Sequence, residues 1–193
     1  MIDLFTTGIH KANNSELADS LYDACKKALD EISNDDEYEN GKTTFFNLDV
    51  IKKYKEFDAF YNFINEELNK YIENLNIDKT NLNLKFKGVW VSEMYKHGNH
   101  GLHVHTNGSI FSGNFYVYAP ENSGELSFNR HEWMSDPWSL IKFTKHDKYN
   151  SVEWNFKPVK GDLYIWKSDL PHRVKNNKND SRIAISFNIG FDE

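Results

Sequence analysis

Cysteine, basic charge and long hydrophobic runs are all scarce in this sequence. The single cysteine, Cys25, cannot form a disulfide within the chain, and its place on the apolar side of a predicted helix indicates a small buried residue rather than a catalytic thiol. The formal net charge is −6, and lysines cluster only in short segments that are typical of solvated loops. Nucleic-acid-binding proteins usually carry a basic excess or a basic stripe, so we do not expect DNA or RNA as a partner.

The sequence also shows neither of the hydrophobic patterns that direct proteins to membranes. No window approaches the length of a membrane span. The first residues contain no basic segment followed by an apolar run, the pattern of a secretory signal. We therefore expect a cytoplasmic protein with no membrane partner.

Aromatic residues, in contrast, are abundant, at 15% of the 193 residues. An aromatic-rich chain punctuated by glycine and proline favours β structure. The length fits one domain with a real core and is short for two. We expect a single domain over residues 1–193, with a helical part at 1–80 and a β-rich core at 81–193.

Apolar residues recur at helical spacing in two regions of the first part. One region runs from Ser15, as its N-cap, to about Ile32, and the other runs from about Val50 to Asn74. Each region has one broad apolar stripe, which indicates a surface that packs against a sheet.

After Asn81 the apolar residues alternate with polar ones, which is typical of strands. Turn residues separate the strand-like segments 82–95, 101–106, 111–119, 124–129, 151–158, 161–168, 172–176 and 181–191. Helices followed by strands oppose an alternating parallel design and favour a double-sheet jelly roll, with the helices on one outer face. The long aromatic segment from 129 to 150 interrupts the strands, and we expect a functional loop or lid there.

Two histidines, His103 and His105, stand one residue apart in the stretch GLHVHT. Side chains at i and i+2 of a strand point to the same face, so both imidazoles are within reach of one ion. A third histidine, His172, follows an apolar strand and a turn, and Arg182 comes ten residues later. A lone His-x-His pair is often a surface accident, but this combination favours a metal site.

The last strand-like segment, 181–191, divides sharply between its two faces. One face is apolar and suited to packing on the helices, whereas the other is small and polar and carries Arg182. An arginine that points into a barrel is costly unless it meets an anion. The alternatives are an exposed arginine at a strand end, or a structural salt bridge with Asp162 or Asp169.

The order of these motifs resembles that of the iron(II)- and 2-oxoglutarate-dependent oxygenases. The motifs are His-x-His at 103–105, Ser-Gly at 112–113 before an aromatic strand that Pro120 closes, Pro-x-x-Gly-Asp at 158–162, the distal His172, and Arg-Ile-x-Ile-Ser-Phe-Asn at 182–188. The resemblance covers roughly residues 88 to 190. It implies a double-stranded β-helix core, a cupin-like jelly roll that the N-terminal helices buttress.

The resemblance also implies that His103 and His172 bind Fe(II). It implies that Arg182 holds the distal carboxylate of the cosubstrate 2-oxoglutarate through a bidentate pair. The superfamily usually has a carboxylate at the position of His105. His105 is therefore either the third ligand, which its spacing favours, or a group beside the iron. Three neutral imidazoles would leave the iron site at +2, which the 2-oxoglutarate dianion would offset.

Two further residues are candidates for supporting roles at the site. If the face that carries Tyr116 looks inward, its hydroxyl can reach 2-oxoglutarate; otherwise Tyr116 is an amphipathic core residue. Asp169, three residues before His172, is expected to orient the ring of that histidine. We assign no catalytic residue beyond the metal ligands.

The sequence therefore predicts an Fe(II)- and 2-oxoglutarate-dependent oxygenase, a hydroxylase, whose substrate is a small molecule or an amino-acid side chain. One alternative is a three-His cupin-type dioxygenase without 2-oxoglutarate, in which Arg182 would bind a carboxylate of the substrate. The other is a non-enzymatic jelly-roll binding module.

Overall fold

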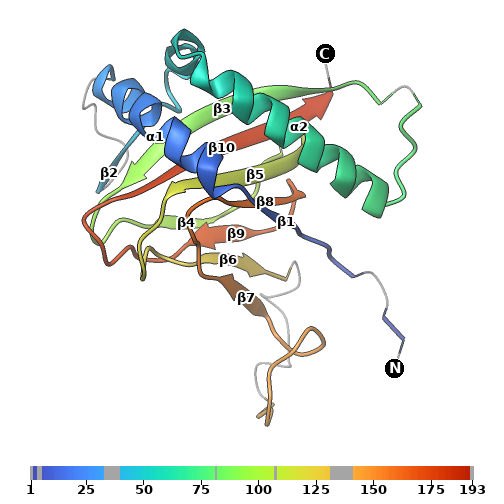
Figure 1. Cartoon of the computed structure of the whole chain (residues 1–193). Helices are drawn as coiled ribbons and strands as arrows, with labels where there is room; N and C mark the ends of the chain where they lie inside the picture. Colours follow the sequence, from blue (N-terminus) through green and yellow to red (C-terminus); the bar gives the residue numbers. More distant parts are fainter. Residues whose placement is uncertain are drawn as a thin grey trace.

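The computed structural model describes residues 2–3, 6–32, 40–80, 82–106, 108–130 and 141–191 of the protein. This part of the chain is mainly β, with two antiparallel sheets and with helices over one of them (Figure 1). The helical elements are α1 (Ser15–Asp30), the 3-10 helix η1 (Leu48–Lys53) and α2 (Glu56–Asn74). Among the described helices, none combines the length and the apolar character needed to cross a membrane.

The larger sheet, here the major sheet, has six strands in the order β1-β8-β5-β10-β3-β2. They are β1 (His10–Asn13), β8 (Asp162–Lys167), β5 (Ser109–Tyr118), β10 (Arg182–Phe191), β3 (Leu84–Met94) and β2 (Gly41–Thr43). The smaller sheet, here the minor sheet, has four strands in the order β4-β9-β6-β7. They are β4 (His100–His103), β9 (His172–Val174), β6 (Leu126–Asn129) and β7 (Glu153–Phe156).

The two sheets pack face to face through an aromatic-rich layer. Phe128 of the minor sheet contacts Trp166 of the major sheet edge to face, with ring centroids 5.1 Å apart. Tyr116 and Tyr164 of the major sheet are fully buried in the same cluster. The arrangement is the double-stranded β-helix that the sequence predicts, so the expected fold class is confirmed.

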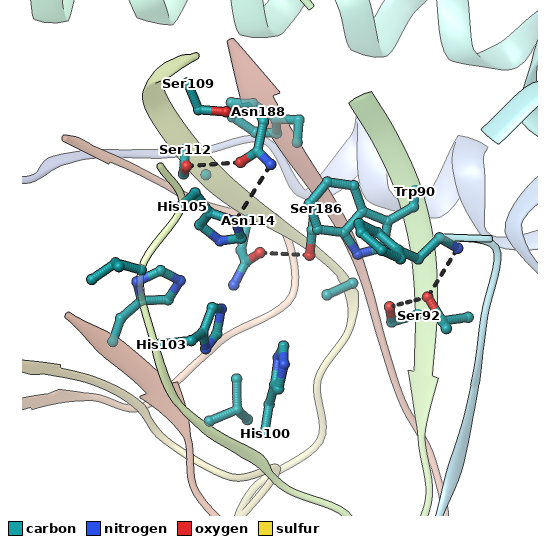
Figure 2. A pocket seen from close by; sticks show the side chains of 18 of the residues that line it. Trp90, Ser92, His100, His103, His105, Ser109, Ser112, Asn114, Ser186 and Asn188 are labelled. Carbon is teal, nitrogen blue, oxygen red and sulfur yellow. Dashed lines mark hydrogen bonds between the residues drawn. The ribbon is translucent and has the colours of Figure 1, made fainter. Parts of the chain in front are cut away.

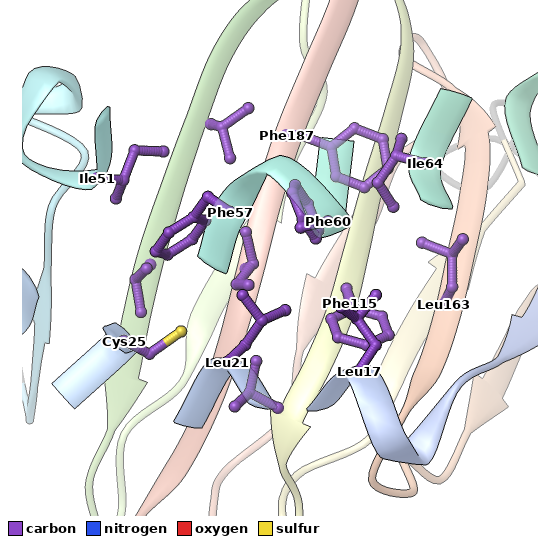
Figure 3. Close-up of a cluster of buried hydrophobic side chains, with 14 of the residues drawn as sticks. Leu17, Leu21, Cys25, Ile51, Phe57, Phe60, Ile64, Phe115, Leu163 and Phe187 are labelled. Carbon is purple, nitrogen blue, oxygen red and sulfur yellow. The ribbon is translucent and has the colours of Figure 1, made fainter. Parts of the chain in front are cut away.

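The helices cover the outer face of the major sheet, as expected (Figures 1 and 3). Leu21 of α1 and Phe60 of α2 are completely buried in the cluster beneath them. Phe60 packs against Phe187 of β10, with ring centroids 6.0 Å apart. Truncation of such a core phenylalanine to alanine typically costs about 3–5 kcal/mol of stability. This layer holds β10 in place. The opposite face of β10 is then free to carry polar groups.

The start of α1 differs by one residue from the prediction. The N-cap is Asn14, whose side-chain oxygen accepts a hydrogen bond from the Leu17 backbone at 3.0 Å, so the assignment to Ser15 is wrong. Asn14 is also fixed from outside the helix, because its N–H donates to the Gly161 carbonyl at 2.9 Å. Gly161 has a φ of 83°, and a Cβ there would lie 2.6 Å from the Ser15 nitrogen. Only glycine fits this junction between the helix and the barrel.

The second predicted helical region is divided in two. Tyr54 adopts an extended conformation between η1 and α2, so the helix proper begins at Glu56 and ends at Asn74 as predicted. Strands β1 and β2 were not predicted, because each has only three or four residues and the alternating pattern needs more. Of the expected loop at 129–150, residues 131–140 lie outside the described part, and 141–150 forms neither helix nor strand.

Candidate functional site

A pocket of about 500 Å³ opens between the inner face of the major sheet and the β4–β9 end of the minor sheet. Alternate residues of β10, from Arg182 to Asn188, line it, and Phe187 also reaches it. The intervening residues of β10 lie in the core beneath the helices. The division of faces predicted for this strand is therefore confirmed. In Figure 2 the labelled histidines lie on one side of the pocket and Trp90 lies on the other, with Asn114 and Ser186 between them.

Three histidines converge on this pocket. His103 ends β4 and His172 begins β9, and the antiparallel pairing of these strands makes the two residues direct partners. Their ring centroids are 4.2 Å apart, and that of His105 lies 5.0 Å from His103 and 5.1 Å from His172. One ring nitrogen from each of the three lies within 4.8 Å of the others. The cluster can hold one metal ion with three nitrogen ligands.

His105 reaches the cluster by a different route from the one predicted. Strand β4 ends at His103, so His105 lies in the following loop and not on the same strand. Its backbone N–H donates to the Ser168 carbonyl at 2.9 Å, which holds the loop against the end of β8. The imidazole also lies 6.4 Å from the Trp90 indole, centroid to centroid.

Backbone carbonyls orient two of the three imidazoles. Nδ1 of His103 lies 2.8 Å from the Gly101 carbonyl oxygen, and Nδ1 of His172 lies 2.8 Å from the Leu170 carbonyl oxygen. Each carbonyl is an acceptor, so Nδ1 carries the proton and Nε2 is left with its lone pair for a metal. The expected role of Asp169 is therefore wrong: the acceptor is the backbone one residue further along the chain.

The third imidazole contacts a chain of side chains on the major sheet. The amide of Asn188 lies 3.4 Å from Nδ1 of His105. Ser112 lies 2.8 Å from both the Asn188 amide and the Ser168 hydroxyl. This chain links the histidine to β5 and β10 and limits the rotation of its ring.

The surroundings keep the imidazoles neutral. Burial lowers the pKa of His172 to about 3, and the neighbouring His103 adds to the effect. Burial, with contributions from His103 and His100, lowers the pKa of His105 to about 4. The pKa of His103 is also lowered by burial, although its bond to the Gly101 carbonyl opposes the shift. A neutral imidazole is the form that binds metals, so the cluster is ready for a cation at neutral pH.

Arg182 is buried in the same pocket, with 3% of its surface exposed. Its Nη1 contacts the Met94 sulfur at 3.9 Å, and Nε and Nη2 have no hydrogen-bond partner among the described residues. Neither alternative reading of this arginine fits. It is not exposed, and Asp162 instead pairs with Lys11 at 3.1 Å. Asp169 is more than half exposed and lies 3.9 Å from Lys167.

Two more buried polar groups lack partners within the described residues. Tyr116 is fully buried, its ring lies 4.7 Å from the Arg182 guanidinium carbon, and its hydroxyl is unpaired. The indole nitrogen of Trp166 is also buried and unpaired, and Trp166 lines the pocket. Buried donors without acceptors are costly in a folded protein. Arg182 and the adjacent Tyr116 together form a region suited to an acceptor-rich anion.

Several pocket residues, among them His100, Phe45 and Phe46, were not assigned to the site from the sequence. His100 stacks on His103 at 4.1 Å between ring centroids, and its place in the same short strand was the available signal. Phe45 and Phe46 line the pocket from the segment after β2. The adjacent pair of aromatics was visible in the sequence, but nothing in it connected residues 45–46 with the histidines.

The comparisons with known proteins agree with this geometry. Residues 88–188, just over half of the chain, match the family model described as putative 2OG-Fe(II) oxygenase. No curated protein sequence matches the chain.

Solved structures show the same fold. A prolyl-4-hydroxylase from Pseudomonas putida is similar with a TM-score of 0.68 at 14% identity, over 97% of this chain and 95% of that one. The viral collagen prolyl hydroxylase from Paramecium Bursaria Chlorella virus-1, in complex with 2-oxoglutarate, gives 0.61 at 18% identity over 96% of each chain. HygX from Streptomyces hygroscopicus, with nickel, 2-oxoglutarate and hygromycin B bound, gives 0.57 at 11% identity over 96% of this chain and 84% of that one.

Proposed function

The chain belongs to the family of putative 2OG-Fe(II) oxygenases, and on that basis we propose that His103, His105 and His172 hold its iron and that Arg182 holds 2-oxoglutarate. The protein is an Fe(II)- and 2-oxoglutarate-dependent oxygenase. The observation that carries the assignment of residues is the convergence of three neutral imidazoles and one unpaired buried guanidinium on a single pocket.

The donor set suits Fe(II). Imidazole nitrogen is a common ligand of this ion, and three neutral imidazoles leave the site with the full charge of the metal. The 2-oxoglutarate dianion then offsets that charge. His103 and His172 present Nε2, because a backbone carbonyl occupies each Nδ1.

Nδ1 of His105 lies 3.4 Å from the Asn188 side-chain nitrogen. The oxygen of the same amide accepts a hydrogen bond from the Ser112 hydroxyl at 2.8 Å, and Ser112 lies 2.8 Å from the Ser168 hydroxyl. A ring nitrogen of His105 lies within 4.8 Å of those of His103 and His172, which supports His105 as the third ligand in place of the usual carboxylate.

The buried guanidinium suits one carboxylate of 2-oxoglutarate. Nε and Nη2 are both unpaired, and two neighbouring guanidinium nitrogens match the two oxygens of a carboxylate. The Tyr116 ring supports the guanidinium from one side, and its hydroxyl is a further donor without a partner. We assign Arg182 as the main contact and Tyr116 as the second one.

When bound, the iron and 2-oxoglutarate supply the oxidation of an unactivated C–H bond by dioxygen. The chain's own residues would position these groups. The aromatic layer of Phe128 and Trp166 closes the pocket behind His172, with Trp166 at 4.8 Å from that ring. For the substrate we propose a small molecule or an amino-acid side chain, the two kinds named for the structures with this fold.

The test is an anaerobic titration of the Fe(II)-loaded protein with 2-oxoglutarate. We expect a visible charge-transfer band when the cosubstrate joins the metal. A protein that binds iron but shows neither the band nor 2-oxoglutarate binding by calorimetry would be a three-His dioxygenase that uses no 2-oxoglutarate. A protein that takes up no iron would be a binding module.

Variants test the ligands one at a time. His172→Ala should lose stoichiometric metal, measured by elemental analysis after gel filtration. His105→Ala should weaken metal binding strongly if His105 is a ligand and hardly at all if it only stands nearby. His146→Ala is the matched control, because His146 is exposed and lies outside the pocket.

A further inference from the structure

Three aromatic side chains form a continuous surface at the mouth of the pocket. Phe45 packs edge to face on Phe46 and on Trp90, with ring centroids 5.4 Å and 5.1 Å apart. Trp90 lies in turn 6.4 Å from His105. We refer to Phe45, Phe46 and Trp90 as the aromatic wall. It runs from the surface of the protein to the proposed metal ligands.

The outer part of the wall faces solvent. Phe46 is 67% exposed and Phe45 is 47% exposed. Each exposed ring forgoes the stabilisation that burial of a large apolar side chain provides. Adjacent exposed aromatics beside a concave site are typical of a binding surface.

The backbone holds these rings firmly. Thr44, between the strand and the two phenylalanines, is completely buried. Its N–H donates to the Val91 carbonyl at 2.9 Å, and its hydroxyl accepts from the Val91 N–H at 3.0 Å. The Phe45 N–H donates to the Thr43 hydroxyl at 3.2 Å. The rings are therefore displayed by an ordered segment tied to β3, and little freedom is lost when a ligand packs on them.

The charge of the pocket restricts what can pack there. Among its described lining residues, none is an aspartate or a glutamate, and Arg182 is the one permanent cation. Iron at +2, 2-oxoglutarate at −2 and Arg182 at +1 leave the loaded pocket at +1. A cationic substrate would find no carboxylate partner, and its desolvation would be uncompensated. Hydroxyls and amides such as Ser92, Ser186 and Asn114 remain for a neutral or anionic group.

From the exposed aromatics, and from a described pocket lining that contains no carboxylate, we infer that the aromatic wall binds the substrate, and that the substrate has an apolar face and no positive charge. This inference rests on the proposed function, because it places the substrate in the pocket that holds iron and 2-oxoglutarate. The apolar face packs on Phe45 and Phe46 and extends towards Trp90. This contact brings a C–H bond close to the metal ligand His105.

The experiment uses two probes of matched size, 3-phenylpropanamide, which is neutral, and 3-phenylpropylammonium, which is cationic. Full-length protein is loaded with Mn(II) and saturating 2-oxoglutarate. Enhancement of probe proton relaxation, relative to Zn(II)-loaded protein, reports binding close to the metal. The neutral probe should be strongly enhanced, and the cation should bind at least several-fold more weakly.

Variants connect this signal with the wall. In Phe45→Ala/Phe46→Ala the neutral probe should bind about three- to tenfold more weakly, the usual size of an aromatic contact. The affinity for 2-oxoglutarate, measured by calorimetry, should not change. Phe191→Ala is the matched control, because Phe191 is 52% exposed and does not line the pocket. Near-ultraviolet circular dichroism confirms that each variant is folded.

The outcomes separate the inference from the proposed function. If the parent protein binds neither Mn(II) nor 2-oxoglutarate, the proposed function fails. If both bind but the double variant and the control hold the neutral probe equally well, the aromatic wall is not the substrate surface. Equal binding of the two probes would overturn the charge argument. A concentration-dependent dimer that the double variant abolishes, seen by sedimentation, would identify the wall as a self-association surface instead.

Discussion

Replacement of Arg182 by methionine should affect two properties of the protein in opposite directions. Arg182 is buried, and its Nε and Nη2 have no hydrogen-bond partner in the part of the chain that the structure describes. Each buried unsatisfied donor costs about 1–3 kcal/mol. The contact with the Tyr116 ring returns up to about 2 kcal/mol. Methionine fills a similar volume beside Met94 without a charge, so Arg182→Met should stabilise the protein by about 1–4 kcal/mol when no 2-oxoglutarate is present.

The same substitution should nearly abolish cosubstrate binding. Loss of one partner from a buried ion pair costs about 3–5 kcal/mol, which is roughly a hundred- to a few-thousand-fold in the dissociation constant. Urea denaturation without ligands measures the first effect, and calorimetry with Ni(II)-loaded protein and 2-oxoglutarate measures the second. Metal binding should persist, because the substitution leaves the three proposed histidine ligands in place.

Arg173→Met is the control for the binding measurement, since Arg173 is partly exposed and pairs with Glu153 outside the pocket. Unchanged affinity of Arg182→Met for 2-oxoglutarate would refute the assignment of the anion site. A loss of several kcal/mol of stability without ligand would show instead that the arginine has a structural role.

Three further predictions concern the scaffold. Gly113→Ala should lower stability by about 1–3 kcal/mol in urea denaturation, because its Cβ would lie 2.7 Å from the Tyr164 carbonyl oxygen; an unchanged midpoint would contradict this packing. Burial raises the pKa of Glu153, but hydrogen bonds from Ser127 and two cationic neighbours outweigh it and hold the pKa at about 2. The stability that the ionised Glu153 carboxylate contributes is present above its ordinary pKa of 4.5 and is lost as the pH falls towards 2. Glu153→Gln should therefore lose less stability than the parent protein between about pH 5 and pH 2.5. Equal losses would show that the Glu153 carboxylate does not contribute to stability. Cys25 is completely buried and burial raises its pKa, so the native protein should not react with Ellman's reagent until it is unfolded; rapid labelling of the native thiol would count against this burial.

The sequence was most informative where one periodicity governs a long element. The apolar face of β10 and the stripes of the two helices followed from spacing alone, because each buries a continuous surface. The motif order from His103 to Arg182 identified the family and the fold correctly. Short or irregular features were not predictable in this way. The capping of α1 by Asn14 depends on a contact with Gly161, far away in the chain.

Contacts between distant segments explain what the sequence could not supply at the site. His105 joins the histidine cluster through a loop bonded to Ser168, and not through the strand geometry that first suggested it. The acceptor for His172 is a backbone carbonyl, which no residue type reveals. The aromatic wall depends on the pairing of β2 with β3, which brings residues 45–46 beside Trp90.

The position of β4 ties cofactor loading to the integrity of the barrel. This four-residue strand lies at one edge of the minor sheet and is hydrogen-bonded to β9 alone among the described strands. His103 and His172 are opposite each other in this one strand pair, so an ion bound by both would cross-link the edge strand β4 to β9. Amide hydrogen exchange along β4 would then slow when the metal binds. The exchange rate of this strand would therefore indicate whether the enzyme holds its metal.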